Sequence, residues 1–177
     1  MKDEDIDKLD LSDWPAPDAF LLELGRIAAL WSCLESFIDL CIWKLSGFDD
    51  LNNPTPFILT KHMSVPQKLD VVGTLCEQLE QNFPTPAGYK EVLGLVRSAQ
   101  ASRNRFVHDG LTLNTDTGMV EMASGSARGS LKTRIDTVNL NDLKRTAIEI
   151  HTANLALYKL VLRREPKPIW EIRRKTT

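Results

Sequence analysis

Apolar residues recur at the three- and four-residue spacing of a helix over most of the chain. Four segments with this pattern are predicted to be helices: residues 18–45, 64–81, 87–109 and 139–164. Asp18 is a candidate cap at the start of the first helix, and Gly47 follows its end. Ser64 and Gln67 have the spacing of a capping box, which predicts the start of the second helix.

The period of the pattern changes to two after Gly110, which is typical of β-structure. Three short segments are predicted to be strands: residues 111–113, 119–122 and 131–137. The small residues at 124–130 are expected to form a flexible connection, and the Asn- and Pro-rich residues 48–63 a loop with room for a short turn. The predicted fold class is therefore all-α: an antiparallel four-helix bundle with a small β-hairpin or meander insert at about 111–138, before the last helix.

The length of 177 residues fits one domain that buries a sizeable core, and we expect it to span residues 18–165. Residues 1–17 form an acidic arm, in which residues 1–13 hold six acidic and two basic side chains. Residues 166–177 form a basic tail. Both ends are interpreted as solvated. The alternative is a tail that contacts phosphate or pairs with the acidic arm of a neighbouring molecule.

Composition and charge exclude several classes of protein. A net charge of −2 does not fit a protein that coats nucleic acid by bulk charge. The sequence has no apolar run long enough for a membrane span, and its first residues are acidic rather than typical of a secretory signal. We therefore expect a cytoplasmic protein without membrane contact.

The cysteines and the known motifs predict neither a metal site nor a cofactor. Cys33, Cys41 and Cys76 have apolar neighbours and are expected to be buried, reduced thiols. The sequence lacks the paired Cys and His spacing of a zinc site, and it has no Gly-rich phosphate loop, GxSxG or HExxH.

Of the three histidines, His108 has the most suggestive surroundings. His62 lies in the Pro-rich loop and is expected to be exposed, and His151 is expected to have a surface or packing role on the last helix. His108 follows Arg103-Asn104-Arg105-Phe106-Val107 near the end of the third predicted helix. One interpretation is a cationic cap at the negative end of the helix dipole. The other is a catalytic cluster.

The spacing within this cluster raises a geometric difficulty. Asn104 and Arg105 precede His108 by four and three residues and so share its face of a helix. Arg103 precedes it by five residues, which places it about 140° away around the axis. Arg103 and His108 can converge only if the helix ends early or if a second copy of the chain completes the site.

These residue types suit cleavage of a phosphodiester without a metal ion. The ordinary pKa of a histidine, about 6.5, allows it to take a proton from a ribose 2′-hydroxyl at neutral pH. An arginine fork can hold the non-bridging oxygens of the phosphate. An asparagine can orient the histidine or donate to the phosphate.

The segment Arg103-Asn104-Arg105-Phe106-Val107-His108 resembles the R-x4-H motif of the HEPN superfamily, whose members are small helical bundles. Trp31-x-x-Leu34-Glu35 and Lys68-Leu69 are also similar to such proteins. The resemblance covers roughly residues 18–165 and is loose outside residues 98–110.

The resemblance implies a homodimeric ribonuclease in which two such motifs face each other and form one composite site on RNA. It makes His108 the general acid or base, Arg103 the phosphate clamp and Asn104 an orienting residue. Arg105 and Arg97 are added as auxiliary substrate contacts. Relatives of this kind occur in toxin–antitoxin and phage-defence systems, so an antitoxin or another protein partner is a further expectation. The β-insert departs from the compact toxins of the family.

Two other functions remain open at this stage. The chain is either a non-catalytic HEPN-like scaffold, in which the same residues only hold a dimer together, or a regulatory protein that docks through its β-insert and tail. Trp31, Phe37 and Trp43 are expected in the core or a dimer contact. Glu35 is expected to pair with a buried Lys or Arg, with Arg103 or Arg97 as candidates. Trp170 is expected to be a docking residue, or else a base-stacking residue of the basic tail.

Overall fold

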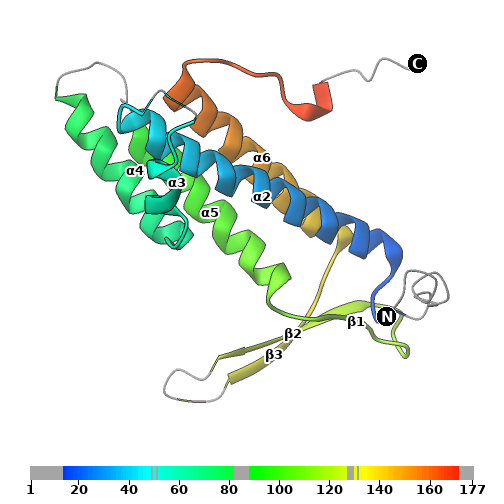
Figure 1. The fold of residues 1–177 in the computed structure, drawn as a ribbon. Coiled ribbons are helices and arrows are strands. Elements are labelled where there is room, and N and C mark those ends of the chain that lie inside the picture. Colours follow the sequence, from blue (N-terminus) through cyan, green and yellow to red (C-terminus); the bar gives the residue numbers. More distant parts are fainter. Residues whose placement is uncertain are drawn as a thin grey trace, which may run out of the picture.

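The computed structural model describes residues 14–48, 50, 52–81, 88–126, 130 and 132–171. Within them the chain is mostly helical, and a three-stranded antiparallel sheet lies at one end of the helices (Figure 1). The expectation of a mainly helical chain with a small β-segment before the last helix is confirmed. The label all-α is too narrow, because the three β-segments pair into a sheet.

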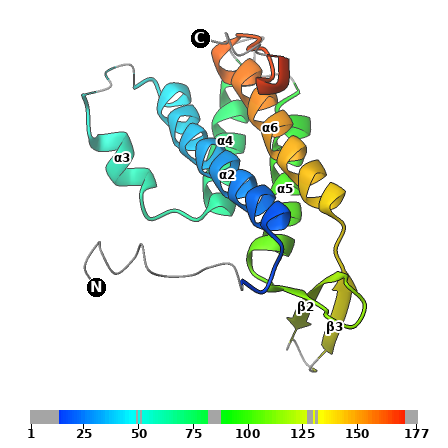
Figure 2. The same cartoon turned by 90° about the vertical axis from the view of Figure 1, so that its right-hand side faces the viewer.

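Four long helices make up most of the described residues. They are α2 (Asp18–Leu45), α4 (Val65–Glu80), α5 (Tyr89–Val107) and α6 (Leu140–Leu162). The loop expected at 48–63 contains a short helix, α3 (Thr55–Thr60), and a single 3₁₀ turn, η1 (Ile169–Glu171), follows α6. Figure 2 shows α3 set apart from the other helices, beside α2.

The helix ends follow local chemistry, with one correction. Ser64 and Gln67 form the predicted capping box, in which the Ser64 backbone N–H donates to Gln67 Oε1 at 2.8 Å. Gly47 ends α2 in the left-handed conformation, with φ of +80°. The prediction that Asp18 caps α2 is wrong. Pro17 occupies the N-cap position and Asp18 is the first helical residue, where its charge still favours the helix dipole.

The core lies between the long helices. α2 packs most extensively against α6, α6 also packs against α5, and α4 contacts both α2 and α5. The largest fully buried apolar side chains come from all four helices and from β2: Ile27, Leu34, Ile38, Leu69, Val72, Val96, Met122, Leu143, Ile150 and Leu157. Burying one such side chain stabilises the fold by about 1.5–3 kcal/mol. As predicted, Trp31 and Phe37 belong to this core, and Phe37 stacks on Tyr158 with ring centroids 4.8 Å apart.

The sheet has the order β1 (Leu111–Leu113), β2 (Val120–Ser126) and β3 (Lys132–Thr137), with both pairings antiparallel. Strand β2 extends into the small residues that the sequence pattern assigned to a flexible connection. The buried side chains of Leu111, Val120 and Met122 anchor the sheet to the core. The Leu113 N–H donates to the Pro15 carbonyl at 2.6 Å, which ties the residues before α2 to the sheet edge.

The cysteines divide into two groups. Cys41 and Cys76 are buried as expected, and burial raises the pKa of both thiols, that of Cys76 to about 11. Both therefore stay protonated at neutral pH. Cys33 is exposed, so the prediction that it is buried is wrong. It lies on α2 beside Ser32 and Ser36, which are also exposed.

Parts of both chain ends lie outside the described residues: residues 1–13 of the acidic arm and residues 172–177 of the basic tail. No helix within the described part has the length and apolar character that a membrane crossing requires.

Candidate functional site

The candidate site lies at the carboxyl end of α5, where the chain turns toward the sheet (Figure 1). The last helical residue is Val107, and His108 is the C-cap residue, whose backbone N–H donates to the Asn104 carbonyl at 3.3 Å. The side chain of His108 is exposed, while those of Arg103 and Asn104 are half-buried. The helix end thus presents the imidazole to solvent beside two partly sheltered polar groups.

Arg103 and His108 meet within a single chain. Arg103 Nη1 lies 3.4 Å from His108 Nε2, despite the five-residue separation. The helix ends directly before His108, and the long arginine side chain carries its guanidinium well away from its own Cα. The first of the two routes to convergence, early termination of the helix, therefore accounts for the contact, and no second copy of the chain is needed for it.

Arg103 is held by contacts on the core side of α5. Its guanidinium carbon lies 5.6 Å from the ring centroid of Trp31, a buried residue of α2, in a cation–π arrangement. Its Nη1 donates to Asn104 Oδ1 at 3.0 Å. Its Nε is buried and has no hydrogen-bond acceptor among the described residues. Trp31 and Asn104 therefore fix the guanidinium while part of its donor capacity stays unused.

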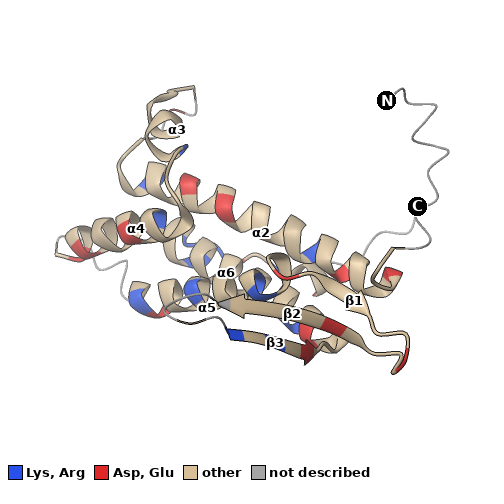
Figure 3. Ribbon diagram, turned by 90° about the horizontal axis from the view of Figure 1, so that it is seen from below, with Lys and Arg blue, Asp and Glu red and all other residues tan. Residues whose placement is uncertain are grey.

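This arrangement suits an anionic ligand. When Arg103 donates to His108 Nε2, that nitrogen carries a lone pair rather than a proton, and the lone pair is free to accept a proton once the guanidinium turns to an anionic ligand. A phosphate oxygen bound by the guanidinium then lies close to a nitrogen that can accept a proton. Lys and Arg also recur along α5, which carries four basic residues and one acidic residue (Figure 3). The helix that holds the candidate site therefore has a net positive charge, in a chain whose net charge is −2.

The two auxiliary arginines are not part of this cluster. Arg105 is exposed, and its guanidinium lies over the ring of its neighbour Phe106 at 5.2 Å. Arg97 Nη2 pairs with Asp70 Oδ1 of α4 at 2.9 Å. Arg97 also precedes Arg103 by six residues, about 9 Å along the helix axis. The contacts found for these two arginines are therefore with Phe106 and Asp70 rather than with Arg103 or His108, and their role as auxiliary substrate contacts stays a prediction.

Glu35 pairs with a buried lysine, as predicted, but with neither candidate arginine. Lys68 of α4 has a side chain that is 5% exposed, and its Nζ lies 3.8 Å from Glu35 Oε1. The closer partner is Asp39, whose Oδ1 lies 2.8 Å and whose Oδ2 lies 3.0 Å from Lys68 Nζ. Of these two oxygens, only Oδ2 has the geometry of a hydrogen-bond acceptor. This cluster joins α2 to α4 and serves the fold.

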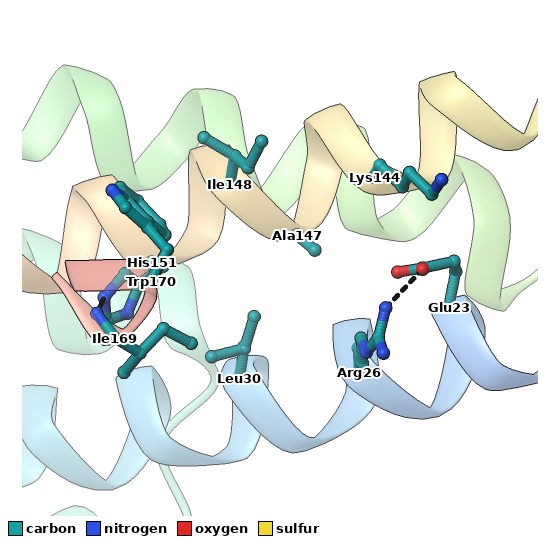
Figure 4. Close-up of a pocket in the computed structure, with 9 residues that line it drawn as sticks. All are labelled: Glu23, Arg26, Leu30, Lys144, Ala147, Ile148, His151, Ile169 and Trp170. Carbon is teal, nitrogen blue, oxygen red and sulfur yellow. Dashed lines mark hydrogen bonds and ion pairs between the residues drawn. The ribbon is translucent and has the colours of Figure 1, made fainter. Parts of the chain in front are cut away.

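The other two histidines lie apart from the site. His62 is exposed, as predicted. His151 is buried on α6, and its Nε2 accepts the backbone N–H of Ile169 at 3.0 Å (Figure 4). Trp170 meets the imidazole edge-on, with ring centroids 5.0 Å apart. The packing role predicted for His151 is confirmed: it fastens the segment after α6 onto that helix. Trp170 therefore docks on its own chain.

The buried position of His151 predicts a loss of stability in acid. Burial lowers its pKa below the ordinary value of about 6.5, so the unfolded chain binds a proton at a pH where the folded chain does not. The free energy of unfolding therefore keeps the full contribution of the buried, neutral His151 above pH 6.5. Below that pH the contribution declines, by at most about 1.4 kcal/mol per pH unit for one proton. Urea titrations between pH 7.5 and 5 should show this decline. The slope should be shallower in His151→Gln, which keeps an acceptor for Ile169. Equal slopes would contradict the assignment.

The described residues contain no group of three or more His, Cys, Asp and Glu side chains arranged to hold a metal ion. Comparison with family models, with curated proteins and with solved structures finds no match for this chain.

Proposed function

We propose that this protein is a metal-independent endoribonuclease of HEPN type, which cleaves RNA by attack of a ribose 2′-hydroxyl on the adjacent phosphate. The single observation that supports this proposal best is the 3.4 Å approach of Arg103 Nη1 to His108 Nε2. It places a phosphate-binding group and a proton acceptor at one point on an exposed helix end.

The three residues take distinct roles in the reaction. His108 Nε2 removes the proton of the 2′-hydroxyl as its oxygen forms the new P–O bond. The P–O5′ bond then breaks, a proton passes to the leaving O5′, and the product is a 2′,3′-cyclic phosphate beside a 5′-hydroxyl. Arg103 holds the non-bridging oxygens and stabilises the charge that gathers on them. Asn104 orients Arg103 through its Oδ1, rather than orienting His108 directly.

The HEPN-like architecture is part of the same proposal. The four long helices correspond to an antiparallel four-helix bundle, and the protein acts as a homodimer. A twofold axis near the end of α5 brings two His108 side chains to one substrate, so that one accepts the first proton and the other supplies the second. The chain belongs to a toxin–antitoxin or phage-defence setting, where an antitoxin or another protein restrains it.

A second function is favoured by the surroundings of Arg103. Its guanidinium packs on the buried Trp31, and its neighbours on the same face of α5, Ala99 and Phe106, belong to the core. A side chain held in this way also suits a non-catalytic homodimeric scaffold, in which the cluster only stabilises the end of α5.

Incubation with RNA separates these two functions. Purified protein in excess EDTA should cut total RNA and leave 2′,3′-cyclic phosphate and 5′-hydroxyl ends, identified by mass spectrometry of the products. A substrate with a 2′-deoxyribose at the cut site should stay intact, because the attacking group is absent. Arg145→Gln, which removes an exposed arginine of α6, should cut like the unmodified protein. Intact RNA with a well-folded dimer would favour the scaffold, and 5′-phosphate ends would exclude 2′-hydroxyl attack.

A further inference from the structure

A cavity of about 260 Å³ opens between α2 and α6, beside the segment that follows α6 (Figure 4). It is remote from His108 along the chain, and its lining includes none of the residues of the candidate site. Leu30 comes from α2, Ala147 and Ile148 come from α6, and Ile169 and Trp170 close one end. The interior is therefore mostly apolar.

The apolar rim of this cavity is unusually open to solvent. Ile148, Ile169 and Trp170 are 52%, 54% and 55% exposed. These three large side chains gather around one opening, where covering them would be favourable by about 25 cal/mol for each Å² of apolar surface. The flat indole of Trp170 and the neighbouring imidazole of His151 also offer aromatic surface at this end.

The opposite end of the cavity carries charge. Figure 4 shows Glu23 and Arg26 of α2 and Lys144 of α6 grouped there. The Glu23 carboxylate is buried, and Arg26 Nη1 donates to it. Arg26 keeps four further donors and the Lys144 ammonium has three. Arg26 and Lys144 supply two positive charges, and Glu23 supplies one negative charge, so this end of the cavity has a net positive charge.

We propose that this cavity binds a small organic anion with a flat apolar body, such as an aromatic carboxylate or sulfonate. The apolar body lies over Leu30 and Ala147, with its far edge against Trp170. The anionic group lies at the other end, where Arg26 and Lys144 donate to it. This site is independent of the proposed cleavage of RNA.

The chemistry of the lining decides between classes of ligand. A cationic ligand would face two positive side chains, while the one carboxylate, Glu23, is already paired. A sugar or another strongly polar ligand would leave its hydroxyls unpaired against Leu30, Ala147 and Ile148. An apolar anion satisfies both ends of the cavity.

Two probes that differ only in charge test this proposal. Naphthalene-1-sulfonate is a flat anion, and naphthalene-1-sulfonamide is its neutral counterpart of nearly the same shape. Isothermal titration of the full chain should show saturable one-to-one binding of the sulfonate and weaker binding of the sulfonamide. Lys144→Gln should weaken binding of the sulfonate about three- to fivefold and leave the sulfonamide unchanged, because it removes one partly exposed charge contact.

Control variants connect the binding to this cavity. Arg145→Gln removes the neighbouring cation, which does not line the cavity, and should leave both affinities unchanged. Ala147→Leu fills the cavity and should abolish binding of both probes. If Ala147→Leu does not fold, Ile148→Glu at the exposed rim should weaken binding of the sulfonate by at least threefold. Absence of saturable binding, equal affinity for the two probes, or equal effects of Lys144→Gln and Arg145→Gln would overturn the proposal.

Discussion

Replacing His108 with Ala is expected to slow RNA cleavage by about 10²- to 10⁴-fold, the range for the loss of a general acid or base. His108 Nε2 is the only imidazole nitrogen within reach of the Arg103 guanidinium in the described part of the chain. Because the His108 side chain is exposed, its removal should leave the melting temperature and the mass of the proposed dimer unchanged. Single-turnover cleavage, thermal unfolding and mass photometry measure these three quantities.

Two matched variants sharpen this test. Arg103→Lys keeps the positive charge but loses the planar fork, and should slow cleavage about 10- to 10²-fold. His62→Ala removes the exposed histidine of the loop and should cleave normally. Normal cleavage by His108→Ala would show that the site is wrong. Parallel loss of melting temperature and dimer mass in His108→Ala would instead assign the cluster a structural role.

Replacing Lys68 with Ala is expected to lower the free energy of unfolding by about 2–3 kcal/mol. The Lys68 ammonium is buried between α2 and α4, where it neutralises Asp39 and lies 3.8 Å from Glu35. Removing one partner of a buried ion pair leaves the other charge uncompensated, which typically costs about 3–5 kcal/mol. The lower value applies here because the carboxylates of Asp39 and Glu35 are 23% and 41% exposed. Urea unfolding measures the change.

An exposed ion pair of the same length provides the control. Arg97 and Asp70 join α5 to α4 at 2.9 Å, with side chains that are 52% and 73% exposed. Arg97→Ala should change the free energy of unfolding by no more than about 0.5 kcal/mol. Lys68→Met keeps most of the side-chain stem and separates lost packing from lost charge. If Lys68→Ala and Arg97→Ala lower the free energy of unfolding by equally small amounts, burial does not strengthen the ion pair of Lys68.

Periodicity and turn chemistry predicted most of the fold because they act locally. The helix at 18–45 was predicted to within one residue at its start, since its apolar stripe is long and Gly47 marks its end. Local patterns failed where neighbours in space decide the outcome. Cys33 has apolar neighbours in sequence but points away from the core, and β2 continues through Ser124 and Gly125 because β3 pairs with them.

The sequence predicted which residues form the candidate site but not all the contacts that hold them. Its motif singled out Arg103, Asn104 and His108, and the structure brings these three together. Nothing in the sequence signals that Arg103 lies over Trp31, which is more than 70 positions away, because that contact depends on how α2 packs beside α5. The packing of α4 against α5 likewise decides that Arg97 pairs with Asp70, a contact that the sequence does not signal.

The extensive packing of α2 against α6 also sets the order in which the protein can be made. These helices are far apart in the sequence, so a nascent chain that has reached only the sheet still lacks Tyr158, the α6 residue on which Phe37 of α2 stacks. Contacts so distant in sequence slow folding relative to a protein built from local helix pairs. The packing of α2 against α6 can form only after residue 162 has left the ribosome, and apolar surface left exposed until then favours aggregation.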